Sequence, residues 1–165
     1  RGLGDVYKRQ GIGSNVGNRR HNLDQAEFQL SGLMDVKSKS KIYETEPQYV
    51  RDQPKFLNAV FHGYTKLEPL PMLEELKKLE VSLGRREGPR NGPRLIDLDI
   101  LYFGERQIST DTLTIPHPRI HERYFVLRPL LDVGPSLYHP VSGKSVQQLM
   151  NELPVGAEKG IIRVL

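Results

Sequence analysis

The sequence contains no cysteine, and this absence excludes a disulfide framework, a thiolate metal site and a cysteine nucleophile. It also lacks any apolar run near the roughly 18 residues that a membrane-spanning helix needs. No apolar signal-peptide segment follows the first residues, so we expect a reducing compartment, with the cytoplasm as the default. With 165 residues, 37% hydrophobic and 27% charged, the chain is typical of one folded domain rather than a disordered protein.

Positive charge exceeds negative charge by a small margin, 24 Lys and Arg residues against 20 Asp and Glu residues. The resulting charge of +4 fits either a polyanionic partner or an enzyme for phosphorylated substrates, so the total does not choose between them. The distribution is more informative, because residues 84–94 (GRREGPRNGPR) hold four arginines and one acid. Two aspartates, Asp97 and Asp99, follow this basic stretch.

Hydrophobic periodicity predicts an α+β fold. Apolar residues at helical spacing indicate helices over 17–33, 70–83 and 145–153, and residues 115–133 are interpreted as a loop that enters a helix. Alternation of apolar and polar residues indicates strands over 36–45, 56–67 and 95–103, and a short hairpin over 107–114. If Ile12 ends a first strand, the elements follow the order strand, helix, strand, strand, helix, strand. This order predicts a ferredoxin-like antiparallel sheet with helices packed on it, a thin α/β/α sandwich.

The two ends of the chain depart from this pattern. Residues 1–10 (RGLGDVYKRQ) carry four charges and no apolar alternation, which predicts a non-native leader in the place of a first strand. We expect the folded domain to span residues 11–153. Residues 154–165 follow the last predicted helix, and we interpret them as a C-terminal extension or a truncated interdomain linker.

Asp97 and Asp99 lie two residues apart on a predicted strand, so both carboxylates point to one face while Leu98 points to the other. Adjacent negative charges repel each other unless a cation lies between them. Carboxylates combined with phosphate oxygens and water are ligands that Mg²⁺ prefers. The pair therefore indicates a magnesium site, and the alternative is a polar stripe that faces solvent.

The loop before the two aspartates supplies arginines, whose guanidinium groups bind phosphate through two parallel hydrogen bonds. Glycines at 84, 88 and 92 would let this loop close over a metal-bound triphosphate. The alternative is a solvated basic loop without chemistry. Its arginines are Arg85, Arg86, Arg90 and Arg94.

Weaker signals lie elsewhere in the chain. His117 stands between two prolines, where it could hydrogen-bond a phosphate or a ribose. The GSN turn at 13–15 lacks the lysine of a P-loop and is more typical of a simple strand-to-helix turn. Phe56 and Asn58 share one strand face, where the ring could stack on a flat ligand and the amide could bind its edge. A core phenylalanine is the alternative.

Two other functions fit parts of the sequence. Basic ferredoxin-like sheets can bind RNA through stacked aromatics, but this chain has no such aromatic run, and Asp97 and Asp99 would repel a phosphate backbone. We therefore expect no nucleic-acid partner. A nucleotide-sugar transferase could also use two aspartates in this spacing, although 165 residues are few for that class.

Four segments occur in order between Gly11 and Leu153: GIGSNVGNR, YETEP followed by DQPKFLNAV, LGRREGPRNGPRLIDLDILYFG, and LTIPHPRIHERYFVLRPL. Together they resemble the 6-hydroxymethyl-7,8-dihydropterin pyrophosphokinase family of folate biosynthesis, and the third segment is the most specific. The resemblance implies an enzyme that transfers pyrophosphate from ATP to the hydroxymethyl group of the pterin. It implies small-molecule substrates, with no membrane or nucleic-acid partner.

The resemblance assigns candidate residues to three groups. The catalytic residues would be Arg85, Arg94, Asp97 and Asp99, with Asp97 and Asp99 holding two Mg²⁺ ions that bridge the ATP phosphates. The ATP-binding residues would be Glu80, Arg86, Arg90, Ile100, His117, Arg119 and Arg123. The pterin-binding residues would be Gly11, Ser14, Asn15, Thr45, Pro47, Phe56, Asn58 and Phe125.

The chain departs from the family pattern at three of its positions. Phe56 stands where tyrosine is frequent, Asn91 where an aromatic residue is frequent, and Glu46 where proline is common. The first change keeps a ring for stacking, whereas the other two alter loop contacts. The HPRIHER and GPRLIDLDILYFG segments resemble eukaryotic relatives fused to dihydropteroate synthase. We therefore expect this kinase to be fused to such a synthase or to act beside it, with mitochondria as an alternative location.

Overall fold

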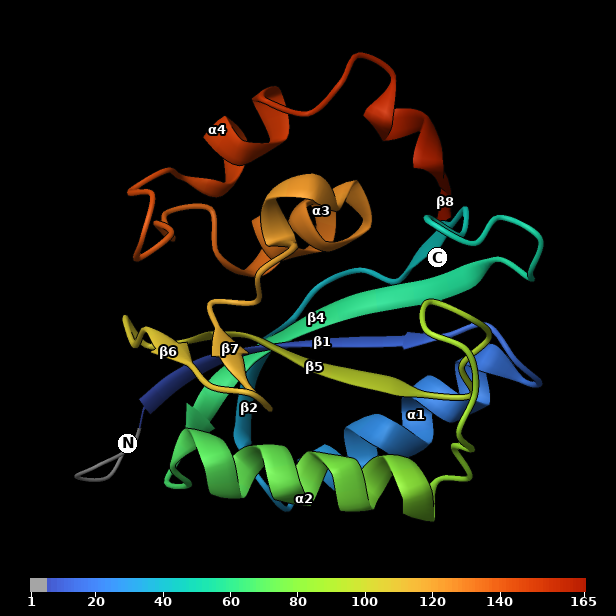
Figure 1. Ribbon diagram of the computed structural model, residues 1–165, viewed down its shortest axis with the longest axis horizontal. Helices are drawn as coiled ribbons and strands as arrows, with labels where there is room; N and C mark the ends of the chain where they lie inside the picture. The colour runs from blue at the N-terminus through green and yellow to red at the C-terminus, as the bar shows by residue number, and fades with distance from the viewer. Residues whose placement is uncertain (1–5) are drawn as a thin grey trace.

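The computed structural model describes residues 6–165, which form one antiparallel sheet with helices on both faces (Figure 1). The strands of this sheet are β1 (Val6–Ser14), β2 (Asp35–Lys39), β3 (Tyr43–Thr45), β4 (Phe56–Thr65), β5 (Asp97–Phe103) and β8 (Ile161–Val164). Their order is β5-β1-β4-β3-β8, and β2 also pairs with β4. A separate hairpin consists of β6 (Ile108–Ser109) and β7 (Thr114–Ile115).

The helices lie in two layers on opposite faces of the sheet (Figure 1). One layer contains α1 (Arg19–Leu30) and α2 (Pro69–Ser82), and the other contains α3 (Tyr124–Val133) and α4 (Val146–Asn151). Two 3-10 helices, η1 (Ile120–Glu122) and η2 (Ala157–Gly160), lie in the connections. The strand order and the two layers confirm the ferredoxin-like α/β/α arrangement that periodicity predicted.

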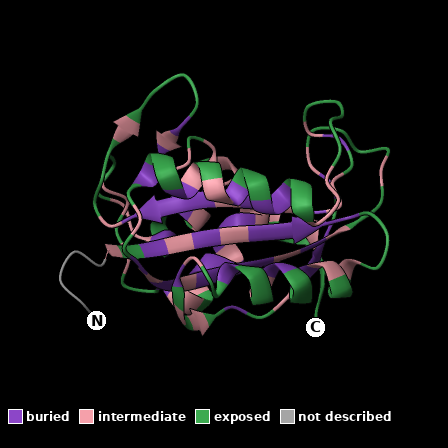
Figure 2. Cartoon of the chain, turned by 90° about the horizontal axis from the view of Figure 1, so that it is seen from below, coloured by how far each residue is buried: buried purple, intermediate pink, exposed green. Residues whose placement is uncertain are grey.

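Each face of the sheet has its own apolar core, and the strands between the layers are largely buried (Figure 2). Ile12, Leu76 and Leu98 belong to the core under α1 and α2. Val60 and Leu127 belong to the core under α3 and α4. Burial on both faces holds β1, β4 and β5 in place, so side chains at their ends occupy fixed positions.

Local side-chain chemistry sets where the helices begin. The Asn18 side chain accepts a hydrogen bond from the His21 N–H at 3.1 Å, which caps α1. Pro69 is the first residue of α2, where its fixed φ suits a helix start. At α4, the side chains of Ser145 and Gln148 each accept a hydrogen bond from the other residue's backbone N–H.

The strand predicted over 36–45 is divided into β2 and β3. Ser40 explains the break, because its N–H donates to the Val60 carbonyl and its hydroxyl accepts from the Val60 N–H. The chain then leaves the ladder and rejoins it at Tyr43, which pairs with Asn58. The Tyr43 hydroxyl donates to Asp132 on α3 at 2.6 Å, which links β3 to the helix layer of α3 and α4.

The strict alternation predicted along residues 96–102 is wrong beyond Ile100. The pairing of β5 with β1 shifts between Gln10 and Arg9, so Leu101 is an extra residue on β5. This bulge places Leu101 and Tyr102 together in the core under α3, whereas Leu98 and Ile100 remain in the opposite core. The register at the two aspartates is unaffected, because the shift lies beyond them.

Both chain ends take part in the sheet. Residues 6–10 form the first half of β1, and Lys8 and Gln10 share the face of Ile12 in the core. Both side chains are fully buried, with Lys8 Nζ and Gln10 Oε1 lacking hydrogen-bond partners. The other end forms β8, which pairs with β3 and which periodicity had not indicated. The predicted leader also includes residues 1–5, which lie outside the described residues.

Candidate active site

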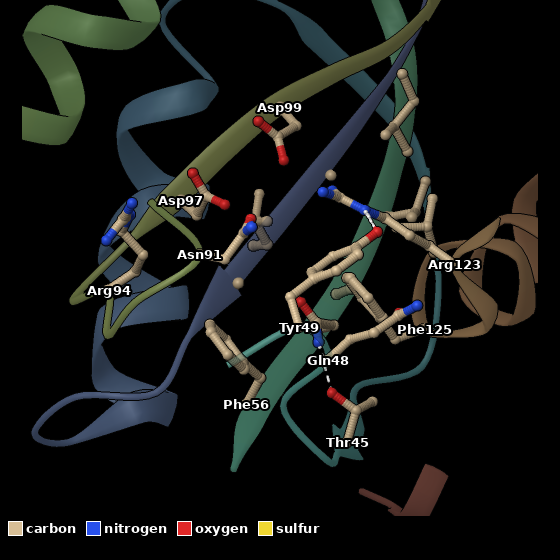
Figure 3. Close-up of a pocket in the computed structure, with 18 of the residues that line it drawn as sticks. Thr45, Gln48, Tyr49, Phe56, Asn91, Arg94, Asp97, Asp99, Arg123 and Phe125 are labelled. Carbon is tan, nitrogen blue, oxygen red and sulfur yellow. Dashed lines mark hydrogen bonds between the residues drawn. The ribbon is translucent and has the colours of Figure 1, made fainter. Parts of the chain in front are cut away.

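One pocket on the α3 face of the sheet collects most of the candidate residues (Figure 3). Its floor consists of residues from β1, β4 and β5, and its walls are the 46–55 loop, the 84–94 loop and the start of α3. The candidate residues that line it are Gly11, Thr45, Phe56, Asn58, Arg85, Arg90, Arg94, Asp97, Asp99, Arg123 and Phe125.

The acidic pair lies at the β5 side of this pocket (Figure 3). Burial and, next, the neighbouring Asp99 charge raise the pKa of Asp97 to about 6, against the opposing field of the nearby arginines. Burial also raises the pKa of Asp99, against the opposing field of Arg123. Two half-buried carboxylates that both resist ionisation indicate a site that favours an added positive charge.

A buried glutamate fixes the geometry beside the pair. Glu80 on α2 accepts hydrogen bonds from Arg85 Nη1 at 2.5 Å and from the Leu98 N–H at 2.9 Å. Arg85 Nη1 also lies 3.2 Å from Asp97 Oδ1. Burial raises the pKa of Glu80, while the bond from Leu98 opposes that change. Glu80 thus lies behind the pocket and orients an arginine that lines it.

The positive charges come from both walls. Arg85, Arg90 and Arg94 belong to the 84–94 loop, and Arg123 immediately precedes α3. The guanidinium of Arg94 donates to the carbonyls of Pro93 and Pro89 at 3.0 and 3.1 Å, so its own loop holds it. Because these arginines surround two carboxylates, the site can accept an anionic ligand together with a cation.

The opposite end of the pocket has different chemistry. Asn58 Nδ2 donates to Thr45 Oγ1 at 2.8 Å, and Phe56 and Phe125 line the same cavity (Figure 3). Gly13 makes room for this arrangement, since a Cβ there would lie 2.5 Å from Asn58 Oδ1. Aromatic rings beside an amide and a hydroxyl can hold a flat heterocycle and bind its edge.

Three candidates for pterin binding lie outside the pocket lining. Asn15 is buried and joins the walls: its N–H donates to the Arg94 carbonyl, and its Oδ1 accepts from the Arg94 N–H at 2.8 Å. Its Nδ2 donates to Gln53 on the other loop at 2.9 Å. Ser14 is buried behind the turn, where its hydroxyl accepts from Asn22, and Pro47 is buried in the 46–55 loop.

Several ATP-binding candidates also lie outside the pocket lining. The Ile100 side chain is in the α1/α2 core, on the sheet face opposite the pocket. His117 Nδ1 accepts from the Arg119 N–H at 3.1 Å, and burial lowers the pKa of His117 to about 4. His117 is therefore neutral at physiological pH. Arg86 is exposed, and Arg119 lies against the ring of Tyr49.

Sequence reasoning missed several lining residues of the two loops as site candidates. Gln48 and Tyr49 project from the 46–55 loop, which lies between the strands predicted over 36–45 and 56–67. Asn91 and Gly92 lie on the facing loop, where the Asn91 carbonyl accepts from Gln53 Nε2 at 2.8 Å. An irregular loop has no periodicity that could have indicated which side chains point inward.

Two negative findings apply to residues 6–165. No group of three or more histidine, cysteine or acidic side chains in this range could hold a metal ion on its own. A cation at Asp97 and Asp99 would therefore need further oxygen atoms from a ligand or from water. In the same range, no helix is both long enough and apolar enough to cross a membrane.

Known protein families and relatives match most of this chain. Residues 10–135 match the family described as 7,8-dihydro-6-hydroxymethylpterin-pyrophosphokinase (HPPK). A folate synthesis bifunctional protein of Arabidopsis thaliana is 52% identical over 124 residues, covering 74% of this chain and 26% of that protein. A 2-amino-4-hydroxy-6-hydroxymethyldihydropteridine pyrophosphokinase of Bacillus subtilis is 44% identical over 124 residues, covering 74% of each.

Solved structures share the fold. Wild-type HPPK-DHPS of Plasmodium falciparum has a TM-score of 0.73 at 17% identity, covering 90% of this chain and 44% of that chain. The chain spans only 19% to 26% of the length of the first three curated relatives that it matches. Because the family match covers residues 10–135 and the Bacillus subtilis relative is matched over most of its length, the chain belongs to the 7,8-dihydro-6-hydroxymethylpterin-pyrophosphokinase family.

Proposed function

We propose that this pocket is where the chain performs the pyrophosphokinase activity of its family, with ATP as cosubstrate and a hydroxymethyl dihydropterin as acceptor. The observation that carries the proposal is the joining of two chemistries in one cavity. Asp97 and Asp99 lie among arginines at one end, and Phe56 and Asn58 lie at the other. A triphosphate and a flat heterocycle would therefore bind side by side.

The arginines would bind the phosphates. Arg85 is oriented by Glu80 and lies 3.2 Å from Asp97, so it stands at the boundary between the loop and β5. Arg90, Arg94 and Arg123 line the same part of the cavity. Guanidinium groups fixed in this way would balance the negative charge that develops on the phosphates during transfer.

Asp97 and Asp99 would hold Mg²⁺, and two ions are part of the proposal. The donor set fits, since two carboxylates with raised pKa values favour a cation and leave coordination positions for phosphate oxygens and water. When bound, the metal would withdraw charge from the phosphates. The two aspartates themselves fix where that charge is neutralised.

Phe56 and Phe125 would stack against the pterin ring, and Asn58, held by Thr45, would bind its polar edge. In the reaction, a bond forms between the hydroxymethyl oxygen and the β-phosphorus of ATP. The bond between the β-phosphorus and the α–β bridging oxygen breaks, so AMP leaves with that oxygen. The hydroxymethyl proton passes to solvent, and the other product is the pterin diphosphate.

Calorimetry separates this proposal from RNA binding and from nucleotide-sugar transfer. We expect the chain to bind a non-hydrolysable ATP analogue with Mg²⁺, and also 6-hydroxymethyl-7,8-dihydropterin. We expect no binding of a short single-stranded RNA, because Asp97 and Asp99 face the open pocket. Binding of RNA or of a nucleotide sugar, without binding of the pterin, would contradict the proposal.

A partnership with dihydropteroate synthase, fused or separate, belongs to the same proposal. It is supported by relatives described as folate synthesis bifunctional proteins and by neighbours that are HPPK-DHPS structures. Some of those relatives are described as mitochondrial. The cytoplasmic and mitochondrial locations therefore both remain predictions for this chain.

A further inference from the structure

Tyr49 has an unusual backbone conformation and lies in the pocket wall. Its φ is 66°, in the left-handed region that side-chain-bearing residues seldom adopt. The side chain lines the pocket and remains 39% exposed, so burial alone does not hold it there. Specific contacts must therefore keep this residue in place.

Those contacts come from a segment about 70 residues further along the chain. The Tyr49 hydroxyl donates to Glu122 Oε1 at 2.5 Å. It also accepts from Arg123 Nε at 3.2 Å (Figure 3). Its ring lies 4.9 Å from the Arg119 guanidinium and 5.4 Å from that of Arg123. The hydroxyl bond lowers the pKa of Glu122, so the carboxylate stays ionised as an acceptor.

This arrangement determines what Arg123 can offer to a ligand. The bond to Tyr49 uses Nε, and among residues 6–165 no side chain or carbonyl accepts a hydrogen bond from its terminal nitrogens. The same guanidinium lies 5.5 Å from the Phe125 ring and acts electrostatically on Asp99. Tyr49 thus fixes the plane of an arginine whose phosphate-binding edge is available.

Tyr49 also belongs to the loop that encloses the other half of the pocket. Thr45, at the start of that loop, holds Asn58. The neighbouring Gln48 donates to the Glu122 carbonyl at 3.2 Å, which adds a second link between the loop and η1. Movement of the loop around a flat ligand would therefore move the support of Arg123.

We propose that Tyr49 is a positioning residue that orients Arg123 for phosphate and couples the nucleotide and pterin subsites. This inference rests on the proposed function. It adds a residue that belongs to neither the acidic pair nor the arginine loop. It requires that binding of one ligand strengthens binding of the other through the Tyr49 contacts, and such coupling is reciprocal.

The first test measures the dissociation constant of a non-hydrolysable ATP analogue with Mg²⁺ by calorimetry. Tyr49→Ala removes both ring and hydroxyl, and we expect about tenfold weaker binding. Tyr49→Phe keeps the ring, and its dissociation constant should lie between those of Tyr49→Ala and the wild type. Tyr138→Ala is the matched control, because Tyr138 is an exposed tyrosine outside the pocket lining. Thermal unfolding checks that all three variants fold.

The second test measures the pterin dissociation constant with and without the saturating nucleotide analogue. We expect the analogue to tighten pterin binding at least about fivefold in the wild type. In Tyr49→Ala the two constants should be nearly equal. If Tyr49→Ala kept the wild-type nucleotide affinity and the wild-type coupling, the role of Tyr49 would be overturned but the proposed function would not. A wild-type chain that binds neither ligand would overturn the proposed function as well.

Discussion

Lys8 is a fully buried lysine whose ammonium group lacks a partner. Burial lowers its pKa from 10.5 to about 7, so the folded state binds fewer protons than the unfolded state between these values. The free energy of unfolding should therefore rise with pH in that window, by up to roughly 1.4 kcal/mol per pH unit from this group. Chemical denaturation at pH 7, 8.5 and 10 measures the slope.

Lys8→Met should raise stability at pH 7 and remove most of this slope, because it keeps the length of the side chain without its charge. Lys66→Met, at an exposed lysine, is the control and should change neither the stability at pH 7 nor the slope with pH. An unchanged slope in Lys8→Met would show that Lys8 does not cause it. The buried lysine and glutamine in β1 also accord with a leader that did not evolve with this core, which remains a prediction.

Asp97 and Asp99 should be needed for turnover and not for folding. Replacement of either by alanine should lower the rate by at least about 10²-fold, the usual loss for one preorganised electrostatic group. Without metal, neither variant should be less stable than the wild type at neutral pH, since burial and mutual repulsion already disfavour both carboxylates. Asp111→Ala, in an exposed turn, is the control. Retention of more than about a tenth of the activity would contradict the assignment.

Sequence reasoning found these aspartates because strand alternation places residues two apart on one face. It did not find Tyr49, since that side chain points inward only through a left-handed backbone and contacts with Glu122 and Arg123. The role of Gly13 depends on the opposing Asn58, which also becomes visible only once the strands pair. The aspartates were predictable from strand alternation and the loop arginines from their charge and the family resemblance, whereas Tyr49 carries neither signal.

At the scale of elements, the 84–94 loop combines four arginines with high exposure. Residues 86–90 are all exposed, while hydrogen bonds between Asn15 and Arg94 and from Gln53 to the Asn91 carbonyl hold the second half of the loop. We expect fast hydrogen exchange in this loop without ligand and clear protection when a non-hydrolysable ATP analogue and the pterin bind, because phosphates supply partners for its arginines. Equal exchange in both states would contradict a closing role. The β6–β7 hairpin provides an internal reference.

The main helices and strands could be predicted because their apolar residues recur with the period of each element. The bulge at Leu101 could not, since it depends on the pairing of β5 with β1. The same holds for β8, whose four residues gain strand structure by pairing with β3, helped by the ion pair of Arg163 with Glu44 at 3.0 Å. Short edge strands take their structure from the neighbour rather than from their own pattern.

In the molecule as a whole, the sheet has an apolar core on each face, and the pocket lies at one end of the α3 face (Figures 1 and 3). Strands β1, β4 and β5 supply the floor, while loops distant in sequence supply the walls. The charged part and the aromatic part are thereby held at a fixed separation. Such a layout favours direct transfer between two bound substrates over a covalent enzyme intermediate.

The central claim is that the bond broken in ATP lies between the α- and β-phosphates. The most direct measurement is chromatography of a reaction containing the chain, ATP, Mg²⁺ and 6-hydroxymethyl-7,8-dihydropterin, beside the same reaction without the pterin. The account predicts one AMP for each pterin diphosphate formed, and no nucleotide turnover without the pterin. Formation of ADP, or turnover that does not depend on the pterin, would contradict it.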